Sequence, residues 1–145
     1  MLRSIAAGIG AARVQEDSLD RPAWREAGVQ VGADELLLVG MPVYAGRVPG
    51  LFHGGLPVRG TGDAVCVVCY GNRAYEDALS ELVGLTRRAG FRVIAAGAFV
   101  TEHSLNGRIA AGRPDEADTA LMEAFGRQVA AKLRDRAACE VPIRV

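Results

Sequence analysis

The chain has 145 residues, half of them apolar and about a quarter charged, so we expect one compact domain over residues 1–145. Seventeen basic residues balance seventeen acidic ones, and this neutral total gives no reason to expect nucleic-acid binding. The apolar runs are far shorter than the ~20 residues of a membrane helix, and three cysteines without a secretory signal favour a cytoplasmic location.

The N-terminal part of the chain is predicted to form short elements. Apolar residues at helical spacing over Leu2–Ile9 indicate a helix, which Gly8 and Gly10 should end early. We expect Ala12–Leu19 to form a short edge strand with Val14 pointing inward.

Two continuous apolar runs predict buried strands. Leu36–Val39, which Gly40 should end, and Ala64–Cys69 both have the pattern of strands covered on both faces in a parallel sheet. The first run leads into Met41–Gly50, whose prolines and glycines predict a loop, and only a brief helix is expected after Pro49.

An amphipathic helix should follow the second buried strand. Asn72 is its expected N-cap and Gly90 its C-terminal stop. Four apolar residues at spacings of four, three and four mark its core face: Ala78, Leu82, Leu85 and Ala89. A further strand is expected over Phe91–Val100, and Thr101–Arg113 is expected to be a long loop.

The last helix is predicted to begin at Pro114, with acidic residues in its first turn and basic residues near its end. Its apolar residues repeat every four positions: Leu121, Phe125, Val129 and Leu133. Strands and helices alternate at the spacing of βα units. The pattern therefore predicts an α/β fold with a parallel sheet and helices on both faces.

Two glycine-containing loops, Pro42–Gly46 and Tyr70–Tyr75, should leave neighbouring parallel strands at the same carboxyl edge of the sheet. A flat aromatic ligand could lie between them, stacked on Tyr44 or Tyr75, although either ring could instead pack within its own loop. The acidic pair Glu76–Asp77, expected in the first turns of the following helix, would repel a phosphate. A neutral ring therefore suits this edge better than an anion.

Other polar residues leave more than one interpretation open. Arg47 and Arg73 are either solvated or paired with nearby carboxylates, and His103 either handles protons beside a redox ring or faces solvent. Cys66 and Cys69 have CxxC spacing, but residues three apart on a strand point to opposite faces. We therefore interpret them as buried apolar residues, and the sequence has no metal-ligand spacing or hydrolase nucleophile motif.

Three segments of the chain resemble one known family. They are PVYAGRVP at residues 42–49, YGNRAYEDAL at 70–79 and EHSLNGRIAAGRPDEAD at 102–118. Together they resemble the flavodoxin-like domain of bacterial and archaeal proteins in which that domain is often followed by a ferredoxin-type iron–sulfur segment. The resemblance implies a three-layer fold with an open parallel sheet in the order 2-1-3-4-5. In such folds the first strand and a Ser/Thr- and Gly-rich phosphate loop precede the first helix, so both are expected to be missing from this chain.

The resemblance also implies FMN at the carboxyl edge of the sheet, used for one- or two-electron transfer. In such folds the loops after the third and fourth strands embrace the isoalloxazine ring. The ring-binding residues implied here are Pro42, Val43, Tyr44, Ala45, Gly46, Tyr70, Gly71, Asn72, Arg73 and Tyr75. Without the phosphate loop the affinity for FMN should fall heavily, because charge-assisted hydrogen bonds are strong single interactions. The implied partner is a redox protein, for instance of the ferredoxin type, and a homodimer is a further option.

Two other functions stay open at this point. One is an NAD(P)H-dependent FMN reductase or quinone reductase, with His103 or Arg73 near the ring. The other is a flavodoxin-like module without a cofactor, which would bind a partner through the edge where the first strand is expected to be missing.

Overall fold

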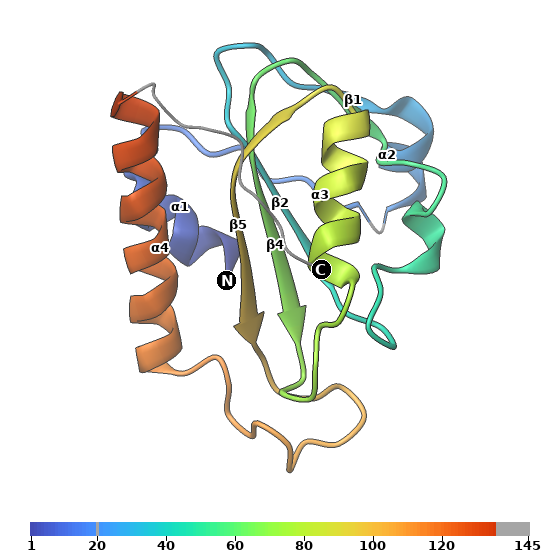
Figure 1. Cartoon of the computed structure of the whole chain (residues 1–145), viewed down its shortest axis with the longest axis vertical. Helices are drawn as coiled ribbons and strands as arrows, with labels where there is room; N and C mark the ends of the chain where they lie inside the picture. The colour runs from blue at the N-terminus through green and yellow to red at the C-terminus, as the bar shows by residue number, and fades with distance from the viewer. Residues whose placement is uncertain (20, 136–145) are drawn as a thin grey trace.

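The computed structural model describes residues 1–19 and 21–135 and contains helices and parallel strands (Figure 1). Its helices are α1 (Leu2–Ile9), α2 (Pro22–Ala27), the 3-10 helix η1 (Gly50–Phe52), α3 (Ala78–Arg88) and α4 (Glu116–Asp135). Its strands are β1 (Val29–Gln30), β2 (Leu37–Pro42), β3 (Val58–Arg59), β4 (Asp63–Tyr70) and β5 (Arg92–Val100). The mixed α/β class predicted from the sequence is confirmed.

Within the part of the chain that the structure describes, the central sheet has three parallel strands in the order β2-β4-β5. Pro42 pairs with Cys69 and Tyr70 pairs with Val100, so the carboxyl ends of all three strands lie at the same edge. The short strands β1 and β3 form a separate parallel pair. Three consecutive loops, after β2, β4 and β5, therefore leave the sheet side by side.

Helices cover both faces of this sheet, α3 on one side and α1 with α4 on the other (Figure 1). Side chains alternate along β4, so Cys66 and Val68 belong to the core under α3, whereas Val65 and Val67 belong to the core that includes α1 and α4. The central strand is thus buried on both faces. This arrangement confirms the prediction made from its continuous apolar sequence.

The N-terminal predictions are wrong in two places. Ala12–Leu19 forms no strand, and the Val14 side chain is 52% exposed instead of pointing inward. Gly40 does not end the first buried strand, because β2 continues to Pro42. A Cβ atom at Gly40 would lie 2.8 Å from the Leu2 Cδ2 atom, so this glycine makes room for α1.

The helices α3 and α4 lie where the sequence predicted them, but their predicted caps and buried faces are only partly confirmed. The four predicted core residues of α3 are all buried, and Gly90 ends that helix with φ 103°. Asn72 is not its N-cap, because α3 begins only at Ala78 and Asn72 lies outside it with φ 59°. In α4 the predicted Val129 is buried and the predicted Phe125 and Leu133 pack against the core, but Leu121 is 62% exposed. The other buried residues of this helix are Asp118, Met122, Gly126 and Ala130.

Candidate functional site

The loop after β2 turns sharply at the carboxyl edge of the sheet. The Val43 amide continues the sheet pairing by donating to the Cys69 carbonyl at 2.9 Å. Tyr44 and Arg47 then exchange two backbone hydrogen bonds, at 2.9 and 3.1 Å, across a two-residue turn. Both central residues have positive φ, 50° at Ala45 and 77° at Gly46, as a type I′ turn requires. This turn presents Tyr44, whose side chain is 58% exposed.

The loop after β4 bends at Asn72 and Arg73, and Asn72 has a φ of 59°. Among the residues that the structure describes, no acceptor takes a hydrogen bond from the amides of Gly71–Ala74. Glu76 and Asp77 do not lie inside α3 as predicted, because they precede its first residue, with Asp77 at the N-cap position. Such unpaired amide groups can donate hydrogen bonds to a ligand.

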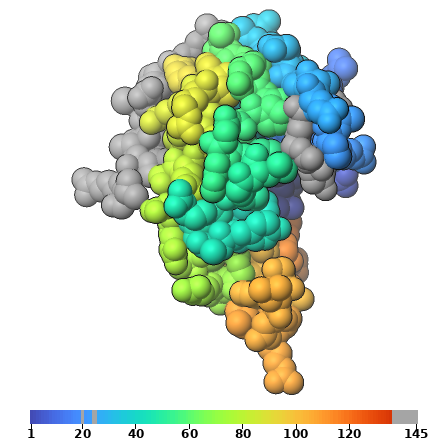
Figure 2. Space-filling model, turned by 90° about the vertical axis from the view of Figure 1, so that its right-hand side faces the viewer, coloured from blue at the N-terminus to red at the C-terminus, as the bar shows by residue number. Residues whose placement is uncertain are grey.

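The loop after β5 forms a third wall, from which the sequence interpretation offered His103 beside the ring as one alternative. His103 is half-buried, and a Cβ atom at Gly71 would lie 2.7 Å from its Cδ2 atom, so the imidazole packs on the glycine. The His103 Nδ1 atom accepts a hydrogen bond from the Leu105 amide at 3.2 Å. The loop itself projects beyond the rest of the molecule, where Figure 2 shows it in orange. The position of β5 beside β4 is the signal that could have placed this loop at the site.

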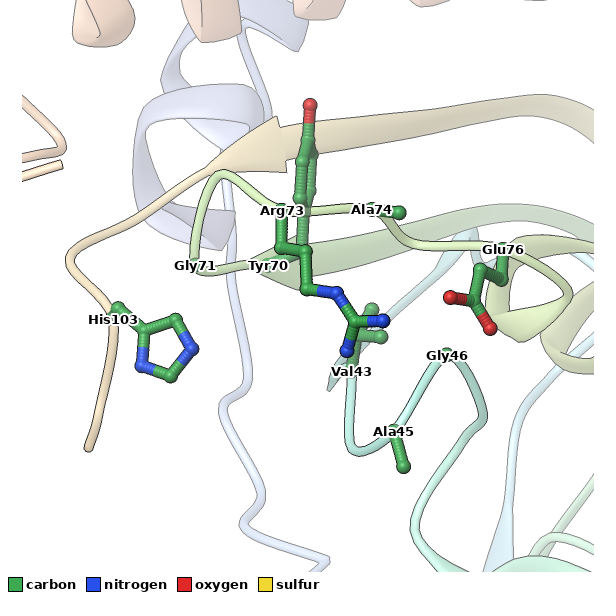
Figure 3. Close-up of a pocket in the computed structure, with 9 residues that line it drawn as sticks. All are labelled: Val43, Ala45, Gly46, Tyr70, Gly71, Arg73, Ala74, Glu76 and His103. Carbon is green, nitrogen blue, oxygen red and sulfur yellow. The ribbon is translucent and has the colours of Figure 1, made fainter. Parts of the chain in front are cut away.

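The three loops enclose two adjoining hollows, and Figure 3 shows the residues around the smaller one, of about 80 Å³. The larger hollow has a volume of about 310 Å³, at the low end for small-ligand pockets. Its lining residues are Val43, Tyr44, Ala45, Gly71, Arg73, His103, Ser104 and Leu105. Gly46, Tyr70, Ala74 and Glu76 join the lining of the smaller hollow.

Seven of the ten residues assigned from the sequence thus line a hollow, and three do not: Pro42, Asn72 and Tyr75. Pro42 is the last residue of β2 and pairs within the sheet. The Tyr75 ring, which is 39% exposed, packs edge-on against Tyr70 with centroids 5.3 Å apart. Of the two tyrosines considered for stacking, only Tyr44 borders the hollow.

Of the two arginines near the site, Arg47 is paired with a carboxylate and Arg73 is not, among the residues that the structure describes. Arg47 forms an ion pair and a hydrogen bond with Glu81 of α3, and the same carboxylate accepts from the Val48 amide at 3.0 Å. The hydrogen bond from Arg47 lowers the pKa of Glu81. Arg73 has no ion-pair partner among the described residues, and its side chain extends toward Val43 (Figure 3).

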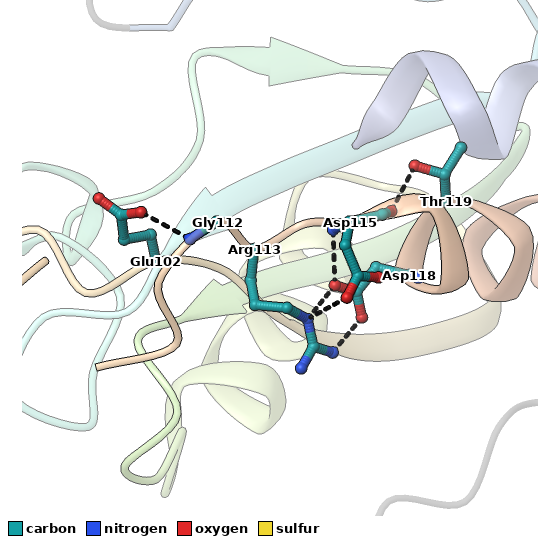
Figure 4. A network of polar contacts seen from close by, with 6 residues as sticks. All are labelled: Glu102, Gly112, Arg113, Asp115, Asp118 and Thr119. Atoms are coloured by element: carbon teal, nitrogen blue, oxygen red, sulfur yellow. Dashed lines mark hydrogen bonds and ion pairs between the residues drawn. The ribbon is translucent and has the colours of Figure 1, made fainter. Parts of the chain in front are cut away.

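A polar network anchors the base of the loop after β5 (Figure 4). Gly112 donates its amide hydrogen bond to Glu102 at 2.9 Å, and Arg113 donates two to the carboxylate of Asp118. Asp115 and Asp118 cap the start of α4 reciprocally, each accepting the other's amide hydrogen bond at 2.9 Å. The hydrogen bonds from Arg113 lower the pKa of Asp118 to about 2. The network ties the loop that carries His103 to α4.

Within residues 1–19 and 21–135, no group of His, Cys, Asp and Glu side chains could hold a metal ion. Cys66 is buried, Cys69 is half-buried, and both thiols are free, while Cys139 lies outside the described residues. In the same part of the chain, no helix is long and apolar enough to cross a membrane.

Comparison with models of known protein families gave no match, and comparison with curated proteins gave none either.

Proposed function

We propose that the chain is a flavodoxin-like electron-transfer module that binds the isoalloxazine ring of FMN in the larger hollow. The observation that carries the proposal is the convergence of three loops on that hollow, each from a strand of one parallel sheet. Ligands of open α/β sheets bind outside the carboxyl ends of the strands, where these loops meet.

The residues around the hollow fit a flat ring with polar edges. Val43, Ala45 and Leu105 offer apolar contact, and Tyr44 offers a face for stacking. The unpaired amides of Gly71–Ala74 would donate to the ring's carbonyl oxygens and ring nitrogens. When bound, FMN supplies one- and two-electron chemistry, and the loops orient the ring and limit its contact with water.

The strand order also supports the proposal. The order β2-β4-β5 with parallel pairing is what strands three, four and five of a 2-1-3-4-5 sheet would give. In that assignment the loops after β2 and β4 are the two that embrace the ring. A redox partner protein would approach from the exposed side of the hollow, near Tyr44 and Leu105.

Titration of FMN and of riboflavin with the purified chain tests this proposal. Binding should quench flavin fluorescence with both ligands, because the proposed contacts are made to the ring that they share. Protein that quenches neither ligand at a large excess would overturn the proposal for this chain. Turnover of NAD(P)H with a quinone would identify a reductase instead of a carrier.

Two tyrosine variants locate the ring. Tyr44→Ala removes the aromatic face beside the hollow and should weaken riboflavin binding roughly threefold to tenfold, the worth of one aromatic pair. Tyr75→Ala is the matched control, since Tyr75 packs against Tyr70 and borders neither hollow. Equal losses in both variants would mean that the ring does not lie beside Tyr44.

A further inference from the structure

We infer that Arg73 selects the oxidation state of the bound ring by favouring its reduced, negatively charged form over its oxidised, neutral form. This inference rests on the proposed FMN site and adds a role for one residue of it. The role follows from two observations: which charged side chains line the hollows, and whether each of them forms an ion pair with another residue.

Among the described residues that line the larger hollow, Arg73 is the one with a permanently charged side chain. No carboxylate of residues 1–19 and 21–135 forms an ion pair with it, whereas Arg47 nearby is neutralised by Glu81. The guanidinium extends across the site toward Val43, from the loop after β4 to the loop after β2 (Figure 3). A positive charge placed between the two ring-embracing loops acts on whatever charge the ring carries.

Glu76 supplies the opposite charge, but in a different place. Its carboxylate lines the smaller hollow and not the larger one, and lies next to Gly46, where a Cβ atom would be 2.0 Å from Oε2. Arg73 lines both hollows, so the larger hollow faces a positive charge, whereas the smaller hollow faces both Arg73 and Glu76. A ring in the larger hollow would experience Arg73 more strongly than Glu76.

Reduction changes the charge of the ring by one unit. Two electrons from a low-potential donor, such as a reduced ferredoxin-type protein, and one proton from water convert the neutral ring to a singly charged anion. No bond to the protein forms or breaks. Because Arg73 interacts with the anion more favourably than with the neutral ring, it should tighten the binding of the reduced form and raise the reduction potential.

The test compares the dissociation constants of the oxidised and the dithionite-reduced flavin. Both are measured for the full chain, the reduced form under anaerobic conditions, with FMN and with riboflavin, which lacks the phosphate. Arg73→Gln should raise the ratio of reduced to oxidised dissociation constants about tenfold with both ligands, equivalent to about 30 mV in a two-electron couple. Glu76→Gln should shift the ratio in the opposite direction.

Two controls keep the charge effect distinct from a structural one. Arg73→Lys keeps the positive charge and should keep the ratio of the unmodified chain. Arg88→Gln removes the same charge from an exposed residue at the end of α3, which leads back to the start of β5 at the opposite edge of the sheet. It should leave the ratio unchanged. Circular dichroism and thermal unfolding verify that each variant is folded.

Three results would overturn the role of Arg73. If Arg73→Gln weakens both oxidation states equally, the residue only positions the ring. If it weakens FMN but not riboflavin, the residue anchors the phosphate. If the unmodified chain binds neither flavin, the FMN site itself fails and the role fails with it, a result that differs from bound flavin with an unchanged ratio.

Discussion

Gly8 of α1 and Gly126 of α4 lie against each other where the two helices meet. A Cβ atom at Gly126 would be 2.9 Å from the Gly8 Cα atom and 2.2 Å from the Ile5 carbonyl oxygen. A Cβ atom at Gly8 would be 2.1 Å from the Glu123 carbonyl oxygen. These are backbone atoms, which cannot rotate away as a side chain can. Backbone-to-backbone packing therefore sets the distance between α1 and α4, and with it the outer layer on that face of the sheet.

Gly126→Ala should destabilise the protein because the added methyl group forces the helices apart. Overpacking of this kind typically costs about 1–3 kcal/mol. Gly84→Ala in α3 is the matched control, because among the described residues its Cβ atom would meet only the Arg88 Nη1 atom, at 3.5 Å. That control should be neutral or stabilising by up to ~1 kcal/mol through helix propensity. Urea unfolding of both variants measures the difference, and equal stabilities would contradict the close helix contact.

Asp118 should make the protein sensitive to acid. Its pKa of about 2 in the folded chain, set mainly by hydrogen bonds from Arg113, lies below the value of about 4 for an unfolded aspartate. The stabilisation is therefore fully present above pH ~4 and is lost as the pH falls toward 2. The urea midpoint should decrease over this range, and Asp118→Asn should remove that part of the decrease. Arg113→Gln should flatten the same part of the profile; an unchanged slope in both variants would exclude the assignment.

The sequence correctly predicted those elements whose local pattern of apolar residues determines which side chains are buried. The apolar run of β4 and the core face of α3 both have spacings that fix burial by themselves. Leu121 was wrongly assigned to the buried face of α4 because a repeat of four residues drifts about 40° per step around a helix of 3.6 residues per turn. The face actually buried includes Gly126, which has no side chain to contribute to an apolar pattern. Gly40 was misread for a related reason, since its role depends on Leu2, a contact distant in the chain.

In the candidate site too, some residues could be placed from the sequence and others could not. Strand order alone places the loops after β2 and β4 together, so residues such as Tyr44 and Arg73 could be found from the sequence. The sequence could not show which of Tyr44 and Tyr75 borders the hollow, because this depends on the packing of Tyr75 against Tyr70. Likewise, the sequence could not show that His103 is half-buried, because its imidazole packs where Gly71 leaves space for it, a contact between two loops.

Cys66 should resist thiol reagents and should couple the stability of the fold to alkaline pH. Burial raises its pKa to about 11, and its Sγ atom donates to the Thr86 hydroxyl at 3.3 Å. The folded state keeps the thiol protonated, so this stability is fully present below the ordinary thiol pKa of about 8.5 and is lost as the pH rises toward 11. Cys66→Ala should show a smaller decrease in urea midpoint over that range than the unmodified chain. Rapid alkylation of Cys66 in the folded protein would contradict its burial.

Glu81 should control the order of the loop after β2, because it accepts hydrogen bonds from both Arg47 and the Val48 amide. Glu81→Ala leaves both donors without this acceptor, so exchange of the Val48 amide should accelerate and riboflavin binding should weaken roughly threefold to tenfold. Glu81→Gln keeps a neutral acceptor for the amide and should lose less. Arg92→Ala removes the pair with Asp63 at the other edge of the sheet and should leave amide exchange at Val48 and flavin binding unchanged. If amide exchange accelerates in Glu81→Ala while riboflavin affinity is retained, the turn after β2 is not a wall of the flavin site.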